Sequence, residues 1–93
     1  MRTISFSSRF KKDFKRESRG LHAKTLVADL KTATDILRVD QPLPARYGDH
    51  PLAGKWMGAR DCHIKPDLVL IYRRPDDKVL QLVRLGSHSE LSL

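Results

Sequence analysis

The sequence of 93 residues contains a single cysteine, Cys62, so no internal disulfide can form. Chains of this kind fit a reducing, intracellular environment. No apolar stretch approaches the length of a membrane span, and the N-terminus lacks the apolar core of a secretory signal. We therefore expect a soluble, cytoplasmic protein with no membrane partner.

Sequence motifs that hold metals or phosphates are also missing. There is no HExxH or CxxC spacing, which would indicate a zinc site. There is also no glycine-rich loop of the type that cradles a phosphate. We predict no bound metal and no cofactor, so any chemistry falls to side chains that the fold brings together.

Acidic residues are scarce in the first quarter of the chain. Residues 1–24 contain eight Lys/Arg and two acidic residues, a charge of +6, whereas the other 69 residues contain ten and nine, a charge of +1. Such a basic segment favours a polyanionic partner, either nucleic acid or an acidic protein. The alternative is a solvated helix face that only keeps the protein soluble.

Length and periodicity predict one α+β domain over residues 1–93. The expected order is β-α-α-β-β-β, an antiparallel sheet with two helices packed against it. A long loop with two X-Pro pairs, residues 39–55, separates the helices from the later strands, and loops of this length are often functional. We expect strands over residues 2–6, 57–64, 67–73 and 78–85, and helices over residues 8–19 and 22–38.

The first helix has clear end signals, because Ser7 or Ser8 can cap its start and Gly20 can end it. Apolar residues recur at helical spacing in both helices, and the simplest interpretation is that they form the core. These residues are Phe6, Phe10, Phe14, Leu26, Leu30, Ala33 and Leu37.

Ionisable residues crowd the start of the later strands. Because side chains alternate along a strand, Asp61 and His63 share one face, and Asp67 lies across the next hairpin from His63. His50 comes from the long loop, and two further residues end the last strand. We expect three histidines, an aspartate and an arginine to meet near one end of the sheet, from the set His50, Asp61, His63, Asp67, Arg84 and His88.

Such a set suits metal-free RNA cleavage. Histidine changes charge near neutral pH and can act as acid or base, and arginine can neutralise a phosphate. RNA supplies its own nucleophile, the 2′-hydroxyl, so no activated serine or cysteine is needed. Other interpretations stay open: Asp61 can pair with Arg60 or cap a turn, and zinc can be shared by three distant histidines, namely His50, His63 and His88.

Other residues of the same kinds have simpler explanations. His22 has no partners in sequence, and we interpret it as an ordinary surface or hydrogen-bonded residue. Cys62 points away from the face of His63 and is expected to be a small buried residue. Trp56 can stack on a base or anchor the loop to the core, and we favour the anchor.

Several ordered motifs resemble one known family. They are "DHPL" at residues 49–52, a tryptophan six residues after His50, "RDCHIKPD" at residues 60–67 and "RLGSH" at residues 84–88. Together they look like the YafQ branch of the RelE/ParE toxin superfamily. The resemblance covers most of the chain, and the helical half agrees with it in pattern.

The resemblance implies the toxin of a type II toxin–antitoxin pair, a ribosome-dependent, metal-independent mRNA endonuclease of β-α-α-β-β-β fold. It implies an antitoxin partner whose C-terminal segment covers the toxin and whose N-terminal half binds operator DNA. Carried over to this chain, the catalytic positions are His50, His63, Asp67 and His88 with Arg84 beside them, and Asp61 in support.

The same resemblance implies that the basic first helix binds ribosomal RNA. The residues expected to bind are Arg9, Lys11, Lys12, Lys15, Arg16 and Arg19. Two alternatives follow from other relatives and from charge alone. ParE-type toxins share the fold but inhibit DNA gyrase, and a non-catalytic RNA-binding module would use only the basic helix.

The chain departs from the family pattern near its C-terminus. The YafQ pattern has a phenylalanine four residues after the final histidine, and this chain has Ser92 there. An aromatic ring stacked on a base contributes about 1–3 kcal/mol per base, and serine cannot stack. We therefore expect looser base discrimination here, and Ser92→Phe should raise cleavage on a subset of codons.

The measurement is a map of cut sites for wild type and Ser92→Phe on one message, at matched ribosome occupancy. Coinciding maps and rates would mean that residue 92 does not contact the base.

Overall fold

The structure, a computed structural model, describes residues 1–93 as helices packed on one sheet. The expected β-α-α-β-β-β order is confirmed, with one added short strand. In chain order the elements are β1 (Thr3–Phe6), α1 (Ser8–Glu17), α2 (Leu26–Arg38), a 3₁₀ turn (Ala45–Tyr47), β2 (His50–Pro51), a second 3₁₀ turn (Gly54–Trp56), β3 (Arg60–Lys65), β4 (Leu68–Arg73) and β5 (Val79–Gly86).

The five strands form a mixed sheet in the order β1-β5-β4-β3-β2. The prediction of a wholly antiparallel sheet was wrong, because β1 lies parallel to β5 while the other neighbours are antiparallel. Periodicity predicts a strand at residues 2–6, but it does not determine the direction of that strand relative to β5, which follows it only after two helices and three other strands. The short strand β2 was missed because two residues carry no periodicity.

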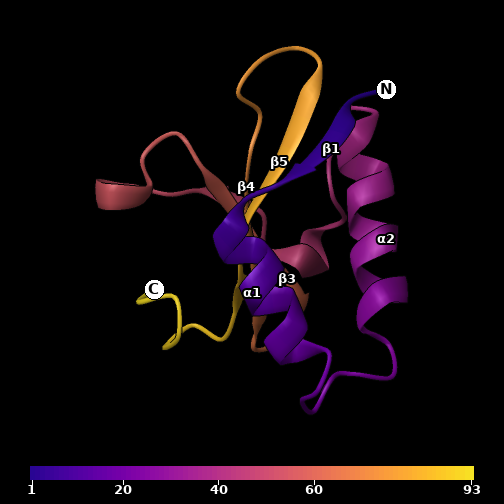
Figure 1. The fold of residues 1–93 in the computed structure, drawn as a ribbon. Coiled ribbons are helices and arrows are strands. Elements are labelled where there is room, and N and C mark those ends of the chain that lie inside the picture. Colours follow the sequence, from indigo (N-terminus) through magenta and orange to yellow (C-terminus); the bar gives the residue numbers. More distant parts are fainter.

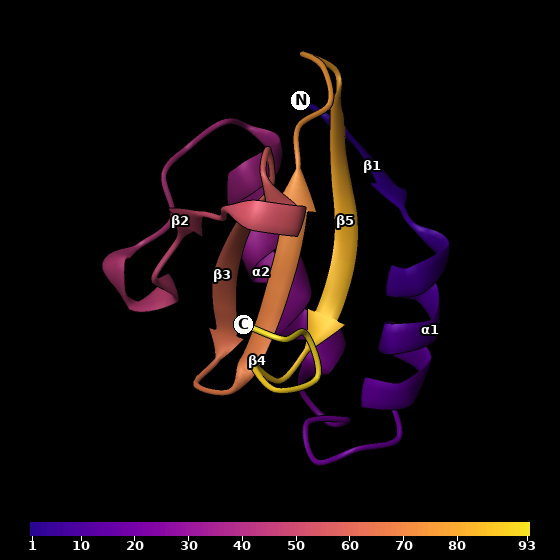
Figure 2. The same cartoon turned by 90° about the vertical axis from the view of Figure 1, so that its left-hand side faces the viewer.

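Helix α2 and the C-terminal segment lie on opposite sides of the sheet, and α1 lies beside β5 (Figure 2). Figure 1 shows α2 on one side, and the second 3₁₀ turn and the C-terminus on the other. In Figure 2, turned by 90°, α2 lies behind β3 and β4, while the chain after β5 passes in front of β4. No helix has both the length and the apolar character needed to span a membrane.

Strand β4 is buried on both faces, which explains its unbroken apolar run. On the helix side, Leu70 and Tyr72 belong to a core cluster with Phe10, Leu30 and residues of β3 and β5. On the opposite side, a smaller cluster contains four buried residues, Ala59, Val69, Ile71 and Leu91. The C-terminal segment is therefore anchored to the sheet by Leu91.

Several expectations about single residues are confirmed. Ser7 caps α1 by accepting a hydrogen bond from the Phe10 backbone N–H at 2.9 Å. Cys62 is fully buried in the main core, and burial raises the pKa of its thiol. Trp56 packs on the smaller cluster and thus anchors the loop, as favoured above.

The predicted helix ends were wrong by a few residues. Helix α1 ends at Glu17 rather than at Arg19, because the backbone N–H groups of Arg19 and Gly20 bond to carbonyls three residues back instead of four. Helix α2 starts at Leu26, since residues 21–25 form turns with the same short bonds. Among the three phenylalanines only Phe10 is buried, whereas Phe6 is 49% exposed.

Candidate active site

Two of the predicted histidines meet on the helix-free face of the sheet. His63 lies on β3, paired across from Val69 of β4. His88 lies in the turn after β5, where Leu91 anchors the chain. The His63 Nε2 and His88 Nε2 atoms are 3.1 Å apart, so one proton can bridge the two rings.

Asp67 orients His88 from the tip of the β3–β4 hairpin. Its Oδ1 atom lies 2.7 Å from His88 Nδ1 and accepts a second bond from the His88 backbone N–H at 3.2 Å. These bonds, the ring contact first, lower the pKa of Asp67 below its usual 3.8. A carboxylate acceptor holds the proton of His88 on Nδ1, so Nε2 is the nitrogen that faces His63.

His50 and Asp61 form a second pair beside the first. Their residues are paired in the β2–β3 register, and His50 Nδ1 lies 2.9 Å from Asp61 Oδ1 and 2.9 Å from the Gly48 carbonyl. The ring is directed at the carbonyl, and Asp61 Oδ1 has no hydrogen-bond partner in the protein. Asp61 does not pair with Arg60, which contacts Asp49 instead.

Asp61 is a buried carboxyl, 3% exposed, with histidines around it. Burial raises its pKa, and the charges of three histidines, His50, His63 and His88, oppose that rise. All three predicted histidines therefore act on one buried group. They do not converge as ligands, because no group of three His, Cys, Asp or Glu side chains is arranged to hold a metal ion.

Gly48 is a residue of this site that sequence reasoning missed. Its φ is +56°, in the left-handed region that favours glycine, and an added Cβ would lie 3.0 Å from His63 Nδ1. Gly48 therefore lets the chain before β2 approach the ring of His63. The nearest signal in the sequence was "YGDH", with a glycine two residues before His50.

Arg84 is placed differently from the expectation. Its Nε and Nη2 donate to the Asp13 carboxylate of α1 at 2.7 and 3.3 Å, and its side chain is 12% exposed. No bond joins it to His63 or His88, whose partners are each other and Asp67. The predicted phosphate-binding arginine is thus an ion-paired, largely buried group.

Most of the basic residues predicted to bind RNA are exposed on or after α1. These are Arg9, Lys11, Lys12, Lys15 and Arg19. Arg16 is exposed too, but its guanidinium pairs with Asp13 at 3.0 Å, Glu17 at 3.0 Å and Glu90 at 3.2 Å. Arg16 is a structural cation rather than a free one.

A polar hollow of about 650 Å³ opens beside His63 at the edge of the sheet. Arg46 and Lys65 supply positive charge to it, although Lys65 pairs with Asp29 at 2.6 Å. Tyr47 lies under the Arg46 guanidinium, 5.0 Å from its ring centre. Asp29 also lines the hollow, so Arg46 is the cation there that has no acidic partner in the structure, and His63 is the member of the histidine pair that faces the hollow.

Comparison with known proteins points to one family. Residues 2–93 match the family model described as the bacterial toxin of type II toxin–antitoxin system, YafQ. The mRNA interferase toxin YafQ of Escherichia coli is 39% identical over 90 residues, which cover 97% of this chain and 95% of that protein.

Solved structures agree with this match. A copper-bound mutant toxin from Helicobacter pylori has a TM-score of 0.84 at 40% identity, covering 98% of this chain and 99% of that one. The E. coli DinJ-YafQ complex contains a chain with a TM-score of 0.77 at 38% identity, with 98% of both chains covered. The fold and the sequence thus match the same proteins.

The role of Gly48 can be tested by Gly48→Ala, with Gly54→Ala as the matched control. Both residues have positive φ, so each alanine should cost about 1–2 kcal/mol of stability. Only the Gly48 substitution places a methyl group against His63, since an added Cβ at Gly54 meets nothing within 4 Å. NMR titration should show altered His63 and His88 signals in Gly48→Ala alone. Equal histidine signals in both variants would mean that Gly48 does not set the position of His63.

Proposed function

The chain belongs to the YafQ family of toxins of type II toxin–antitoxin systems, and we propose that it cleaves mRNA on the ribosome through proton transfer by His63 and His88. It is an mRNA interferase, an endoribonuclease. The observation that carries the proposed mechanism is the 3.1 Å contact between the two Nε2 atoms. A pair of imidazoles that shares one proton contains one acid and one base.

The reaction needs two proton transfers at one phosphate. The base removes the proton of the 2′-hydroxyl, whose oxygen attacks the adjacent phosphorus. The bond from phosphorus to the 5′-oxygen breaks, and that oxygen takes a proton from the acid. The products are a 2′,3′-cyclic phosphate and a 5′-hydroxyl, and no metal ion takes part.

Asp67 supports this chemistry by fixing the tautomer of His88. Because folding lowers the pKa of Asp67, its carboxylate keeps the contact as pH falls and loses it only below that lowered value. A loss of activity at a pH above about 4 therefore has a cause other than protonation of Asp67. His50, placed by β2 and by the Gly48 carbonyl, supplies a third imidazole near the buried Asp61.

Positive charge for the phosphates comes from two sides. Arg84 lies at the end of β5, and Arg46 and Lys65 line the hollow beside His63. A messenger strand that passes from the hollow across the histidine pair would meet cations on its way. The exposed basic residues of α1 then provide a separate, sequence-independent contact to ribosomal RNA.

The partner of such a toxin is an antitoxin, as in the E. coli DinJ-YafQ complex. In our proposal the antitoxin's C-terminal segment covers the toxin, and its N-terminal half binds operator DNA. A groove of about 510 Å³ between β1, α1 and α2 supports such covering. Its floor is apolar, with Phe6 and Val27 exposed. Lys11, Lys31 and Arg38 line it together with Asp35, which pairs with Lys31. An acidic amphipathic segment suits these contacts.

The two alternatives explain less of the molecule. A gyrase inhibitor or a non-catalytic RNA-binding module has no need for a hydrogen-bonded histidine pair oriented by an aspartate. Two of the relatives that match over nearly the whole chain are named mRNA interferases.

The proton-transfer roles can be tested by His63→Ala and His88→Ala. Each should slow cleavage of ribosome-bound mRNA by about 10²–10⁴-fold, the usual contribution of a general acid or base. His22→Ala, a histidine outside the site, is the matched control and should cleave normally. Melting curves should show all three variants folded. Normal cleavage by folded His88→Ala would remove His88 from the mechanism.

Metal independence has its own test. Treatment with EDTA should leave cleavage on pre-assembled ribosomes unchanged. Activity that is lost with EDTA and restored by zinc or copper would instead favour a metal site at the histidines.

The proposed contact between α1 and ribosomal RNA can be tested by the salt dependence of ribosome binding. Lys12→Glu should reduce the slope of log affinity against log salt by about 0.7–0.9, the loss of one phosphate contact. Lys78→Glu, which makes the same charge change in the turn before β5, is the control and should leave the slope near wild type. Equal slopes for both variants would mean that α1 does not contact ribosomal RNA.

A further inference from the structure

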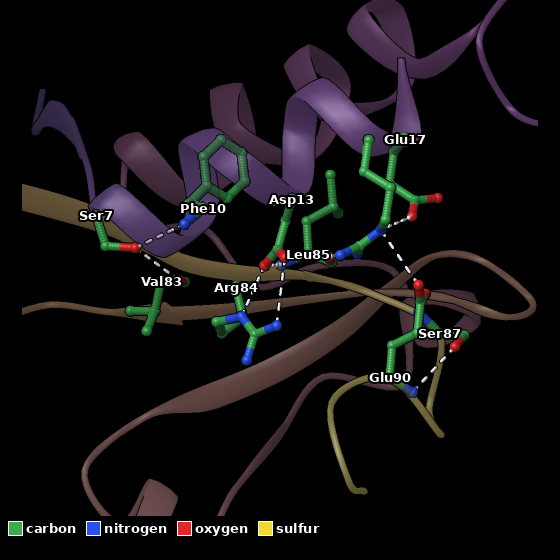
Figure 3. Close-up of polar contacts among 10 residues, drawn as sticks. Ser7, Phe10, Asp13, Glu17, Val83, Arg84, Leu85, Ser87 and Glu90 are labelled. Atoms are coloured by element: carbon green, nitrogen blue, oxygen red, sulfur yellow. Dashed lines mark hydrogen bonds and ion pairs between the residues drawn. The ribbon is translucent and has the colours of Figure 1, made fainter. Parts of the chain in front are cut away.

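Asp13 is a buried carboxylate of α1 that the proposed mechanism does not use. It is only 3% exposed, yet its two oxygens accept hydrogen bonds from three residues. Figure 3 shows Arg84 bound to it from below α1. The donors are Arg84 Nε at 2.7 Å and Nη2 at 3.3 Å, the Leu85 backbone N–H at 3.0 Å and Arg16 Nη1 at 3.0 Å.

The groups around Asp13 stabilise its charged form. Burial alone would raise its pKa, but the bonds from Arg84 and Leu85 and the charges of Arg84 and Arg16 lower it overall. The carboxylate is therefore ionised at neutral pH. Removing a buried charge with such partners leaves them unpaired, so Asp13 fixes its neighbours strongly.

Asp13 contacts β5 just beyond the point where β1 stops pairing with it. Strand β1 pairs with β5 only up to Phe6, which lies opposite Leu82. Just beyond, the register between β4 and β5 shifts, since Tyr72 pairs with Leu82 but Ile71 pairs with Arg84. Side chains from α1 and its cap take the free backbone groups there: Ser7 donates to the Val83 carbonyl at 2.7 Å, Asp13 accepts from Leu85 N–H, and Arg16 donates to the Leu85 carbonyl at 2.9 Å.

This arrangement determines the direction of Arg84. A register shift of this kind re-aims the side chains around it. Two of the three guanidinium nitrogens are held by Asp13, and in Figure 3 the third has no dashed contact and points away from α1. One face of the arginine is thus fixed, and one nitrogen is left for another acceptor.

A second connection runs from Asp13 to the segment that carries His88. Arg16, bound to Asp13, also pairs with Glu90 at 3.2 Å. Glu90 in turn accepts a hydrogen bond from the Ser87 backbone N–H at 2.8 Å, next to His88. Helix α1 therefore holds both functional residues at the end of β5.

We propose that Asp13 is a positioning residue for catalysis, which directs Arg84 toward the scissile phosphate and, through Arg16 and Glu90, holds the turn of His88. This inference rests on the proposed function, because it assigns Arg84 to the phosphate and His88 to proton transfer. Asp13 itself contacts no substrate.

The test measures kcat and KM of Asp13→Asn, Arg84→Ala and the double variant on ribosomes programmed with one message. Asp13→Asn should lower kcat by about 10–100-fold, as expected when a reacting group is misplaced, with KM within about twofold of wild type. Because Asp13 acts in part through Arg84 and in part through Arg16 and Glu90, the loss of kcat in the double variant should be smaller than the product of the two single losses. Asp35→Asn, which removes an exposed helix ion pair with Lys31, is the matched control and should cleave normally.

Arg84→Lys keeps the test decisive if Asp13→Asn does not fold. Lysine keeps the charge but cannot span both carboxylate oxygens, so kcat should fall nearly as far as in Arg84→Ala. A wild-type kcat in folded Asp13→Asn or in Arg84→Lys would overturn the proposal. It would also be overturned if the losses of the two single variants multiplied in the double variant.

A measurement that does not depend on mRNA cleavage separates this proposal from the proposed function. The Arg84 Nε–H signal in NMR should be protected from exchange in wild type and exposed in Asp13→Asn, and Asp13→Glu should restore part of the protection. If wild type does not cleave mRNA while this signal behaves as expected, the proposed function fails, but the positioning of Arg84 by Asp13 stands. An Arg84 signal that is unprotected in wild type overturns the positioning of Arg84 by Asp13 itself.

Discussion

The burial of β4 on both faces is the constraint on which the rest of the structure depends. On one face it packs against α1 and α2 through Leu70 and Tyr72, and on the other it packs against Leu91 through the small cluster of Val69 and Ile71. The first contact forms the core, and the second returns the C-terminal segment to the sheet. Without that return His88 would not reach His63, so the active site exists because a strand between two apolar surfaces must be covered twice.

The sequence predicted the parts of this site better than their connections. Alternation along β3 correctly placed Asp61 and His63 on one face, because the period of a strand is fixed by its geometry. It did not predict that Asp61 would lie beside His50, since β2 is two residues long and has no pattern to read. It also placed Arg84 and Arg16 among the free cations. Their pairing with Asp13 depends on how α1 docks on β5, and no local pattern contains that information.

The basic N-terminal region therefore contains two kinds of cation. Lys12 and Lys15 are exposed and keep their charge for a polyanion, whereas Arg16 donates hydrogen bonds to Asp13, Glu17 and the Leu85 carbonyl and pairs with Glu90. Arginine suits the second task because its planar group can bind several oxygens at once. The two acidic residues of residues 1–24 are both in this network, so they lower the net charge of α1 without breaking up its exposed lysines.

The histidine pair has one further physical consequence for the proposed mechanism. Two nitrogens 3.1 Å apart leave no room for a phosphate between them, so the contact must open when RNA binds. His63 is the more fixed of the two, because it belongs to β3 in the sheet and Gly48 lies against its Nδ1. His88 lies in a turn joined to the body by the Asp67 contact, the Glu90 contact and Leu91. The displacement therefore falls on His88, and Asp67, 69% exposed at the hairpin tip, can follow it and keep its tautomer fixed during the opening.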